Sequence, residues 1–194
     1  MKNAKIITDV TISKEIRKHI TKIDIPDSVE YIGNKAFFNC TNLTSINIPD
    51  SIENIGSWAF YGCENLKSIN IPNSVENIED NAFSNCEKLT SIFIPDSVKD
   101  IGFEAFAFCE NLTSIVIPDS IEYVGSWAFF DCSNLKSIIF KGKTIDQVKS
   151  MENYPWGIKD KSIIKAGKNL NEEKTVKKKY TKKQIEESIK YWQK

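Results

Sequence analysis

The fold of this chain is decided by the stretch CTNLTSINIPDSIENIGSWAF, which runs from Cys40 to Phe60. Related stretches follow one another at a constant 23-residue step, with no insertion between Pro26 and Leu135. Four residue types keep this step: Cys40, Cys63, Cys86, Cys109 and Cys132; Pro26, Pro49, Pro72, Pro95 and Pro118; Phe37, Phe60, Phe83, Phe106 and Phe129; and Leu43, Leu66, Leu89, Leu112 and Leu135. Four columns in one register do not arise by chance, so the sequence indicates a repeat protein.

Within the quoted unit, Leu43, Ile46 and Ile48 have the spacing L-x-x-I-x-I, the strand motif of leucine-rich repeats, whose units run about 20–29 residues. The motif recurs at Ile20-Ile23-Ile25, Leu66-Ile69-Ile71, Leu89-Ile92-Ile94, Leu112-Ile115-Ile117 and Leu135-Ile138-Phe140. It predicts six short parallel strands. A proline follows each of the first five and ends the strand, because proline has no N–H for a ladder. The Ala-Phe pair is expected on the opposite wall, in one short helical or 3-10 turn.

One such unit cannot bury its own apolar side, whereas stacked units share a continuous core. Hydrophobic residues make up 41% of the chain and fall in the repeat columns, so they can fill such a core. The sequence predicts an α/β repeat fold: a leucine-rich-repeat solenoid with a parallel β-sheet on its concave face, short helical or 3-10 turns opposite, and a C-terminal helix. Residues 1–19 are expected to form an N-terminal cap, 20–140 the solenoid, 141–167 a C-terminal cap, and 168–194 a basic linker with an amphipathic helix.

The residues IPDSVEYIGNKAFFNCTNLTSI, from Ile25 to Ile46, resemble the BspA-type leucine-rich-repeat family, and the resemblance covers about Ile20 to Phe140. The resemblance implies a curved solenoid that acts by binding other molecules. The family has no catalytic residues that could be assigned to positions of this chain. Members occur in bacteria, protists and their viruses, and many are surface proteins that bind host proteins or matrix. The sequence departs from the family pattern at Glu79, where the other units have glycine. That departure bears on one local turn and not on the fold.

The pattern changes after Phe140, where KGKTIDQVKSMENYPWGIKDKSIIKAG, residues 141–167, resembles the closing segment of some bacterial and phage-encoded proteins of this type. We expect a short helix over residues 144–151, an added strand at residues 162–164, and a cover for the last coil from Trp156 and Ile158. At the other end, the apolar contacts of the cap are expected from Ile6, Ile7, Val10, Ile12 and Ile16. Solenoids need such ends because an open strand edge invites aggregation.

The sequence offers little chemistry. The five cysteines occupy one column and are odd in number, which favours buried thiols that fill the core; a disulfide between coils about 4.8 Å apart is the alternative. Zinc sites need paired cysteines or histidines that are missing here. A calcium site in the aspartate column is disfavoured, because turn capping accounts for those residues. His19 is the single histidine, and no glycine-rich phosphate loop exists. We therefore predict no enzyme, metal site or cofactor.

Outward positions of the strands give the first candidate surface. The residues between the last two apolar positions form a column: Asp24, Asn47, Asn70, Phe93, Val116 and Ile139. Its second half is apolar and is flanked by serines, so Phe93, Val116 and Ile139 are predicted to anchor a partner protein, with Asn47 and Asn70 beside them. Exposed apolar patches often mark interfaces. The alternative is that the C-terminal cap folds over this patch.

Aromatic residues beside the Ala-Phe pairs give a second candidate surface. Trp58, Trp127, Tyr61 and Phe103 are predicted to form an aromatic rim, because large aromatics are frequent binding anchors. The alternative is that rim aromatics pack between neighbouring coils, which is favoured for Phe38 and Phe130 in particular.

Charge is divided along the chain. Residues 168–194 hold nine lysines and four glutamates, whereas the stretch 1–167 carries seventeen basic and twenty-two acidic side chains. The tail is expected to carry a basic run, Lys177, Lys178 and Lys179, and a short helix with Ile185, Ile189 and Trp192 on one face. Such a helix is marginal alone in water, so it is expected to dock, to pair with a second copy or to bind a partner.

The function that these features predict is a non-enzymatic protein-binding module, with host proteins among the expected partners, including a host-defence protein if the gene is viral. The alternatives are an oligomerising scaffold that self-associates through the C-terminal helix, and nucleic-acid contact through the lysine-rich tail, which the acidic body disfavours. The first residues lack the roughly 7–15-residue apolar stretch of a secretory signal, and no stretch approaches the roughly 18 apolar residues of a membrane span. An intracellular location is expected, with the cell surface as the alternative for a trimmed chain.

Overall fold

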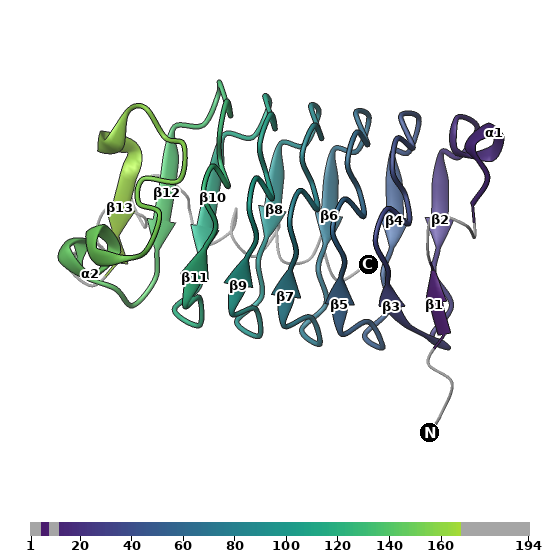
Figure 1. The fold of residues 1–194 in the computed structure, drawn as a ribbon, viewed down its shortest axis with the longest axis horizontal. Coiled ribbons are helices and arrows are strands. Elements are labelled where there is room, and N and C mark those ends of the chain that lie inside the picture. Colours follow the sequence, from purple (N-terminus) through teal and green to yellow (C-terminus); the bar gives the residue numbers. More distant parts are fainter. Residues whose placement is uncertain (1–4, 8–11, 168–194) are drawn as a thin grey trace, which may run out of the picture.

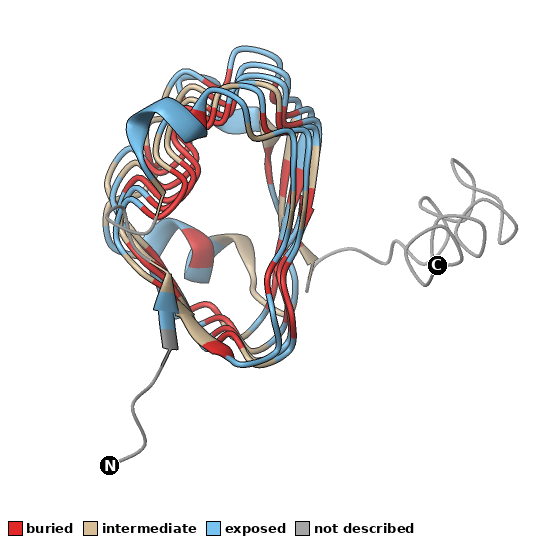
Figure 2. Cartoon of the chain, turned by 90° about the vertical axis from the view of Figure 1, so that its right-hand side faces the viewer, coloured by how far each residue is buried: buried red, intermediate tan, exposed pale blue. Residues whose placement is uncertain are grey.

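The computed structural model describes residues 5–7 and 12–167, which form a row of stacked coils with a short helical segment near each end (Figure 1). Seen along its long axis, each coil is a closed loop with parallel strands on two of its sides (Figure 2). The structure thus confirms the leucine-rich-repeat solenoid. Within the described residues, the helices are α1 (Lys14–Arg17), α2 (Ile145–Ser150) and the 3-10 helix η1 (Lys161–Ile163).

The predicted L-x-x-I-x-I strands form one side of the solenoid, which we call the serine wall after its outward column of serines. Its strands are β2 (Lys22–Asp24), β4 (Ser45–Asn47), β6 (Ser68–Asn70), β8 (Ser91–Phe93), β10 (Ser114–Ile117), β12 (Ser137–Phe140) and β13 (Ile164–Ala166). They pair in parallel as three groups, β2-β4, β6-β8 and β10-β12-β13. The register follows the 23-residue step, with Ile23 opposite Ile46 and Ile115 opposite Ile138.

A second parallel sheet forms the side that we call the glutamate wall, and the sequence did not predict it. Its strands are β1 (Lys5–Ile7), β3 (Val29–Ile32), β5 (Asn54–Ile55), β7 (Asn77–Ile78), β9 (Asp100–Ile101) and β11 (Tyr123–Val124), in that order. Most of these strands contain two residues. Alternation over two residues gives no periodic signal, because a strand pattern needs about four to eight residues to stand out.

The third side, residues 34–39 and their equivalents, is called here the turn wall, and its form differs from the expected helical or 3-10 turn. In a 3-10 helix each N–H donates three residues back. Here Ala36 and Phe38 do so, at 3.2 and 3.1 Å, whereas the alternating N–H groups of Lys35 and Phe37 donate to the next coil, at 2.9 and 2.7 Å. The backbone alternates because Lys35 and Asn39 hold φ of 58° and 55°. Half of the turn's hydrogen bonds therefore join coils rather than close a helix.

The core is a stack of identical columns along the solenoid axis. The phenylalanines Phe37, Phe60, Phe83, Phe106 and Phe129 are all fully buried and stack with centroids 5.1–5.8 Å apart. The cysteine column is buried beside them, as free thiols, which agrees with the predicted core role. The thiol of Cys63 donates to the carbonyl of Phe37 at 3.3 Å, and the next three coils repeat this contact. Burial raises the pKa of Cys40 to about 11 and that of Cys132 to about 12, so the column stays protonated at neutral pH.

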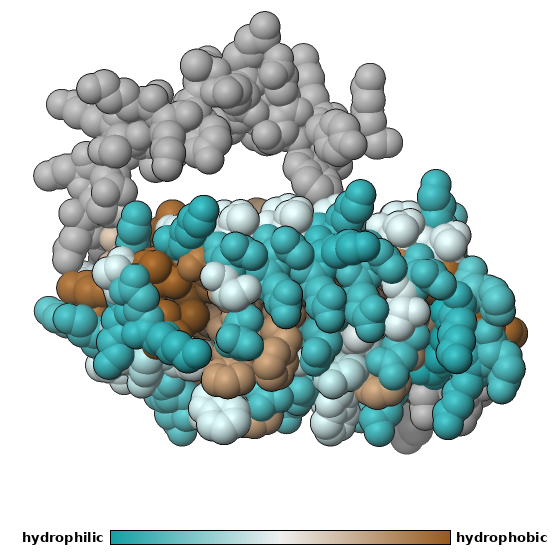
Figure 3. Space-filling view, turned by 90° about the horizontal axis from the view of Figure 1, so that it is seen from above, coloured by the Kyte–Doolittle hydropathy of each residue, from teal (hydrophilic) through white to brown (hydrophobic). Residues whose placement is uncertain are grey.

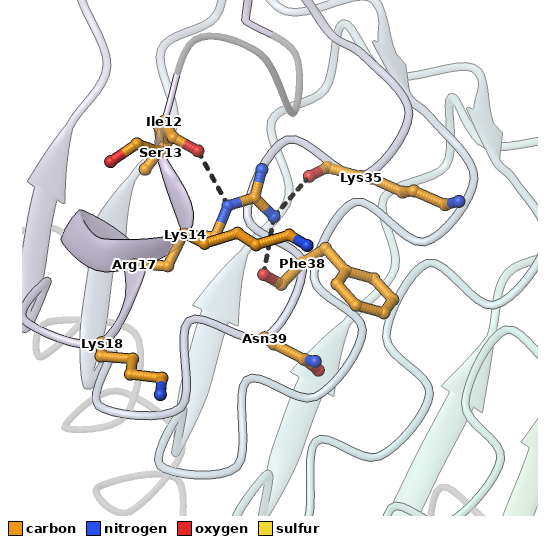
Figure 4. Close-up of a pocket in the computed structure, with 8 residues that line it drawn as sticks. All are labelled: Ile12, Ser13, Lys14, Arg17, Lys18, Lys35, Phe38 and Asn39. Carbon is orange, nitrogen blue, oxygen red and sulfur yellow. Dashed lines mark hydrogen bonds between the residues drawn. The ribbon is translucent and has the colours of Figure 1, made fainter.

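The N-terminal end is closed by Arg17, a residue that the sequence did not single out (Figure 4). Its guanidinium Nη1 donates to the carbonyl oxygens of Phe38 at 2.7 Å and Lys35 at 3.2 Å, and its Nε donates to Ile12 at 2.9 Å. In every later coil, a carbonyl equivalent to that of Phe38 accepts an N–H from the coil before it, as Tyr61 does from Asn39. Arg17 thus supplies the donor that a preceding coil would supply.

The apolar contacts expected at this end are corrected in part. Ile7 and Ile12 pack against the core, as expected. Ile6 and Ile16 are instead 52% and 56% exposed, so they are not cap contacts. Val10 lies outside the described residues.

The C-terminal end is closed by residues 141–167. Helix α2 begins at the capping box of Thr144 and Gln147, and Trp156 is fully buried against the ring of Phe140, at 5.1 Å. The carbonyl of Trp156 accepts the N–H of Phe129 at 3.1 Å. In the earlier coils this acceptor is a carbonyl of the following coil, as when Phe106 donates to Ala128. The expected added strand is present as β13 but begins at Ile164, after η1.

Glu79 occupies the position of Gly56 and Gly102 without disturbing the fold. Its N–H donates to Ile55 at 3.1 Å, as the N–H of Gly56 donates to Ile32 at 2.8 Å. Its carboxylate reaches back one coil and accepts from the amide and hydroxyl of Ser57, both at 2.9 Å, and from Asn54 at 3.1 Å. The local turn is therefore kept, with the glutamate tied to the preceding coil.

Candidate protein-binding surfaces

The predicted outward column of the serine wall is present and runs in register across the strands. Asp24 lies opposite Asn47, Asn70 opposite Phe93, and Val116 opposite Ile139. The C-terminal cap extends this column, because β13 pairs with β12 and places Lys165 opposite Ile139. Since β13 lies beside β12 in the same sheet, its pairing does not cover the column.

Phe93 and Val116 are the exposed apolar residues of this column. Phe93 is 57% exposed and Val116 is 39% exposed, on the neighbouring strands β8 and β10. Ile139 is half-buried, so it contributes less surface than expected, while Asn47 and Asn70 are exposed. Ser91 and Ser114 precede the two apolar residues on their strands and are themselves exposed and small. Full burial of a Phe or Val side chain is worth about 1.5–3 kcal/mol, so this pair offers a partner a definite gain.

The aromatic rim lies on the turn wall, and its members are both exposed and in contact with each other. Trp58, Phe103 and Trp127 are 38%, 40% and 52% exposed, and Tyr61 is half-buried. Phe103 and Trp127 meet with ring centroids 6.1 Å apart. Figure 3, which looks at the solenoid from above, shows hydrophobic side chains gathered toward the C-terminal cap among otherwise hydrophilic ones. Exposure and packing between coils thus occur in the same rings, rather than as alternatives.

Phe38 and Phe130 behave as expected for residues that pack between coils. Both are half-buried. Phe38 stacks on Tyr61 of the next coil at 5.0 Å, and Phe130 meets Phe108 of the preceding coil in an edge contact at 5.5 Å. They support the rim rather than extend it.

The predicted residues therefore form two separate surfaces rather than one site. The serine-wall column carries Phe93 and Val116, and the turn wall carries the rim. The tail residues Lys177, Lys178, Lys179, Ile185, Ile189 and Trp192, and with them the expected C-terminal helix, lie outside the described residues.

Sequence reasoning did not single out Asn81, which lines the groove of the turn wall, or Tyr123, which is exposed on the glutamate wall. Asn81 lies in the turn wall between exposed aromatics, and the signal for it was the absence of an aromatic where Trp58 and Trp127 stand. Tyr123 is 38% exposed on the glutamate wall, and its hydroxyl accepts a hydrogen bond from Asn153 of the cap at 3.2 Å. No repeat column marked it, because that position carries asparagine or aspartate in the three preceding coils.

Within residues 5–7 and 12–167, no group of three histidine, cysteine or acidic side chains could hold a metal ion. In the same part of the chain, no helix has the length and apolar character to cross a membrane.

Comparison with known proteins agrees with this architecture. The family model described as the BspA type leucine rich repeat region matches residues 14–136 in six copies. The crystal structure of a leucine-rich-repeat protein from T. pallidum is similar at a TM-score of 0.63 and 28% identity, covering 76% of this chain and 69% of that one. A leucine-rich cell surface protein from Faecalibacterium prausnitzii is 32% identical with a TM-score of 0.48; the match covers 62% of this chain and 39% of that protein. No match was found among curated proteins. The repeat step, the stacked core and the family match together place this chain in the BspA-type leucine-rich-repeat family.

Proposed function

We propose that this protein is a non-enzymatic protein-binding module that docks a partner protein onto the serine wall. The observation that carries the proposal is the exposure of Phe93, at 57%, directly beside Val116 on a wall whose other outward residues, apart from the half-buried Ile139, are small or polar. Apolar residues of this size, centred on a surface with a polar surround, are the usual anchors of protein interfaces.

Family membership supports the same class of function, because repeat solenoids of this kind usually bind other proteins. The register of the serine-wall strands indicates how a partner would be oriented. Since the column advances by one coil at each repeat, a partner that lies along the solenoid meets Asn47 and Asn70 at one end and the apolar pair at the other. The polar half would fix its orientation, and the apolar half would supply most of the affinity.

The test is affinity capture with the full chain, comparing wild type with the double variant Phe93→Asn/Val116→Asn. Asparagine is what this column carries at Asn47 and Asn70, so the change keeps a residue type that the wall accepts. Each captured protein is then purified, and its affinity for both chains is measured. We expect the double variant to lose about tenfold or more in affinity.

The matched control is Ile16→Asn, which removes an equally exposed apolar side chain, 56% exposed, from the N-terminal end. It should leave the affinity unchanged. If the double variant binds as wild type does, the partner docks elsewhere and the serine-wall proposal fails.

A further inference from the structure

A slot interrupts the aromatic rim at the third coil. The positions that hold Trp58 and Tyr61 in the second coil hold Asn81 and Ser84 in the third. The slot is an open groove between the rings of the second and fourth coils. We call it the rim slot: its floor is Asn81, Ser84 and Asn85, and its walls are Trp58 and Tyr61 on one side and Phe103 and Phe108 on the other.

Trp58 and Tyr61, which form the near wall of the slot, each contact a residue of the first coil. Tyr61 stacks on Phe38 of the first coil, with ring planes 9° apart, so its opposite face is turned toward the third coil. Trp58 has the ammonium of Lys35, also in the first coil, 5.2 Å from its ring centroid. Both partners belong to the first coil, beyond these two rings as seen from the third coil, and both also line the groove.

The far wall has the same organisation. Phe103 lies 6.1 Å from Trp127, and Phe108 lies 5.5 Å from Phe130 in an edge contact. Trp127 and Phe130 both belong to the fifth coil, again away from the slot. Rings that are packed on one side lose little freedom when a ligand packs on the other, so the walls are preorganised.

Two wall residues hold a backbone conformation that their side chains do not favour. Trp58 and Phe108 have φ of 56° and 58°, in the left-handed region that glycine and asparagine adopt most readily. Asn85 and Gly62 show that those residue types serve at the position of Phe108 in other coils. Every coil has positive φ at the position of Trp58, as Lys35 and Glu104 show, so the conformation there belongs to the turn. Phe108 is half-buried and stands where the other coils carry asparagine, glycine or aspartate, so its ring is kept at a position whose backbone favours a smaller residue.

The width of the slot limits its occupant. One coil step measures 5.2 Å between the centroids of Phe60 and Phe83, and 5.5 Å between those of Phe83 and Phe106. Walls two steps apart are therefore about 11 Å apart, and each wall needs about 3.5–4 Å of contact distance. A single ring or a single extended backbone fits between them, whereas a helix does not.

The floor offers one free amide. Asn81 is 7% exposed, and its side chain makes no hydrogen bond to any described residue. Ser84, 1% exposed, already accepts from Asn85 at 3.2 Å. The amide of Asn81 is not fully enclosed and lines the slot, so a ligand in the slot can pair with it. A ligand that presents one carbonyl and one N–H satisfies it, as a peptide group does.

The slot is lined by one carboxylate, that of Glu104, and one ammonium, that of Lys35. Glu104 lines it, and its carboxylate forms no ion pair within the described part of the chain. The stretch 1–167 carries seventeen basic and twenty-two acidic side chains, so the body as a whole attracts cations. Lys35, the cation at the rim, is already placed on Trp58.

We propose that the rim slot binds a proline-containing peptide segment that carries a basic side chain. A polyproline II segment is narrow, is stiff before binding, and has no internal hydrogen bonds, so its backbone groups are free to pair with Asn81. Aromatic-lined grooves recognise such segments by packing proline rings on the aromatic faces. A lysine or arginine of the segment pairs with Glu104. This site lies on a different wall from Phe93 and Val116, so it does not depend on the function proposed above.

The test uses the full chain and a fluorescein-labelled heptapeptide, Pro-Pro-Arg-Pro-Pro-Arg-Pro, followed by fluorescence anisotropy. The control peptide replaces each proline by alanine and keeps both arginines. We expect the proline peptide to bind about tenfold or more tightly than the control, and its addition to shift the side-chain amide resonance of Asn81.

The plug variant Ser84→Tyr fills the slot with a ring that the first, second and fifth coils carry at this position, as in Tyr61. It should keep the thermal unfolding midpoint and lose about tenfold or more in peptide affinity. Glu104→Gln should weaken binding and flatten its dependence on salt. Phe93→Asn/Val116→Asn should bind the peptide as wild type does, which separates this proposal from the previous one.

Three results would overturn the proposal. The first is equal affinity for the proline and alanine peptides, or no binding of the proline peptide up to about 1 mM. The second is unchanged binding by the folded Ser84→Tyr variant. The third is binding of cellohexaose, a neutral oligosaccharide, that Ser84→Tyr abolishes while the peptide does not bind; the slot would then be a sugar site.

Discussion

At the scale of single residues, Glu79 shows how one coil accepts a residue that its neighbours exclude. A Cβ on Gly102 would lie 2.5 Å from the backbone nitrogen of Asp80, so glycine is required in that coil. The third coil instead carries a carboxylate that bonds to Ser57 and Asn54 of the second. The sequence marked this position as a departure, but the partners became visible only when the coils were stacked.

We predict that Glu79→Ala lowers the free energy of unfolding by about 1–2 kcal/mol. The hydroxyl of Ser57 and the amide of Asn54 lose their acceptor, while the amide N–H of Ser57 keeps the side-chain oxygen of Asn34 at 2.9 Å. Urea denaturation measures the change.

The control is Glu76→Ala, whose ion pair with Lys99 at 3.7 Å is well exposed, so it should shift stability by less than about 0.5 kcal/mol. Equal effects of the two substitutions would show that the bonds of Glu79 to the second coil are not stabilising.

At the scale of elements, the turn wall joins coils by backbone bonds that need a donor at the N-terminal end. Arg17 supplies that donor from the short helix α1. Charged donors to carbonyl oxygens are stronger than neutral ones, and the guanidinium is nearly buried, at 7% exposure. The cap therefore acts at the carbonyl of Phe38, where a preceding coil would otherwise act.

We predict that Arg17→Met destabilises the first coil by about 1.5–3 kcal/mol, because the carbonyls of Phe38 and Lys35 lose a charged donor. Hydrogen exchange should accelerate for amides of the first coil and much less for those of the fourth, since each coil contacts only its neighbours.

Lys18→Met is the matched control, because Lys18 lies beside Arg17 but is exposed. Exchange that accelerates evenly along the whole solenoid in Arg17→Met would contradict a local capping role.

At the scale of the whole molecule, stability depends on covering the last coil. Trp156 does this from the C-terminal cap: it is fully buried, contacts Phe140 at 5.1 Å, and receives the N–H of Phe129. A solenoid whose end coil loses its cover exposes both apolar surface and an open strand edge.

We predict that Trp156→Ala lowers the free energy of unfolding by about 3–5 kcal/mol and promotes aggregation on heating. Thermal unfolding with light scattering measures both. Trp127→Ala removes the same side chain from a position that is 52% exposed, and it should change stability by no more than about 1 kcal/mol. Similar losses for the two tryptophans would rule out a special role of the cap.

The sequence by itself determined the repeat, the serine wall and the core columns. Each coil repeats the same 23-residue pattern, and a period in the sequence becomes a column in space when coils stack in register. The exposed pair Phe93 and Val116 followed from that register alone, because alternate residues of a strand point to opposite faces.

Only the tertiary structure decided the features that depend on contacts between coils. The glutamate wall has strands too short to give a periodic signal, and the turn wall alternates bonds within and between coils, which no local pattern predicts. The rim slot exists because the rings of the second and fourth coils are held apart over the small residues of the third. The walls, the caps and the slot all form when the coils stack. Stacking brings together residues that lie about one repeat apart in the sequence, and a local sequence pattern does not show these contacts.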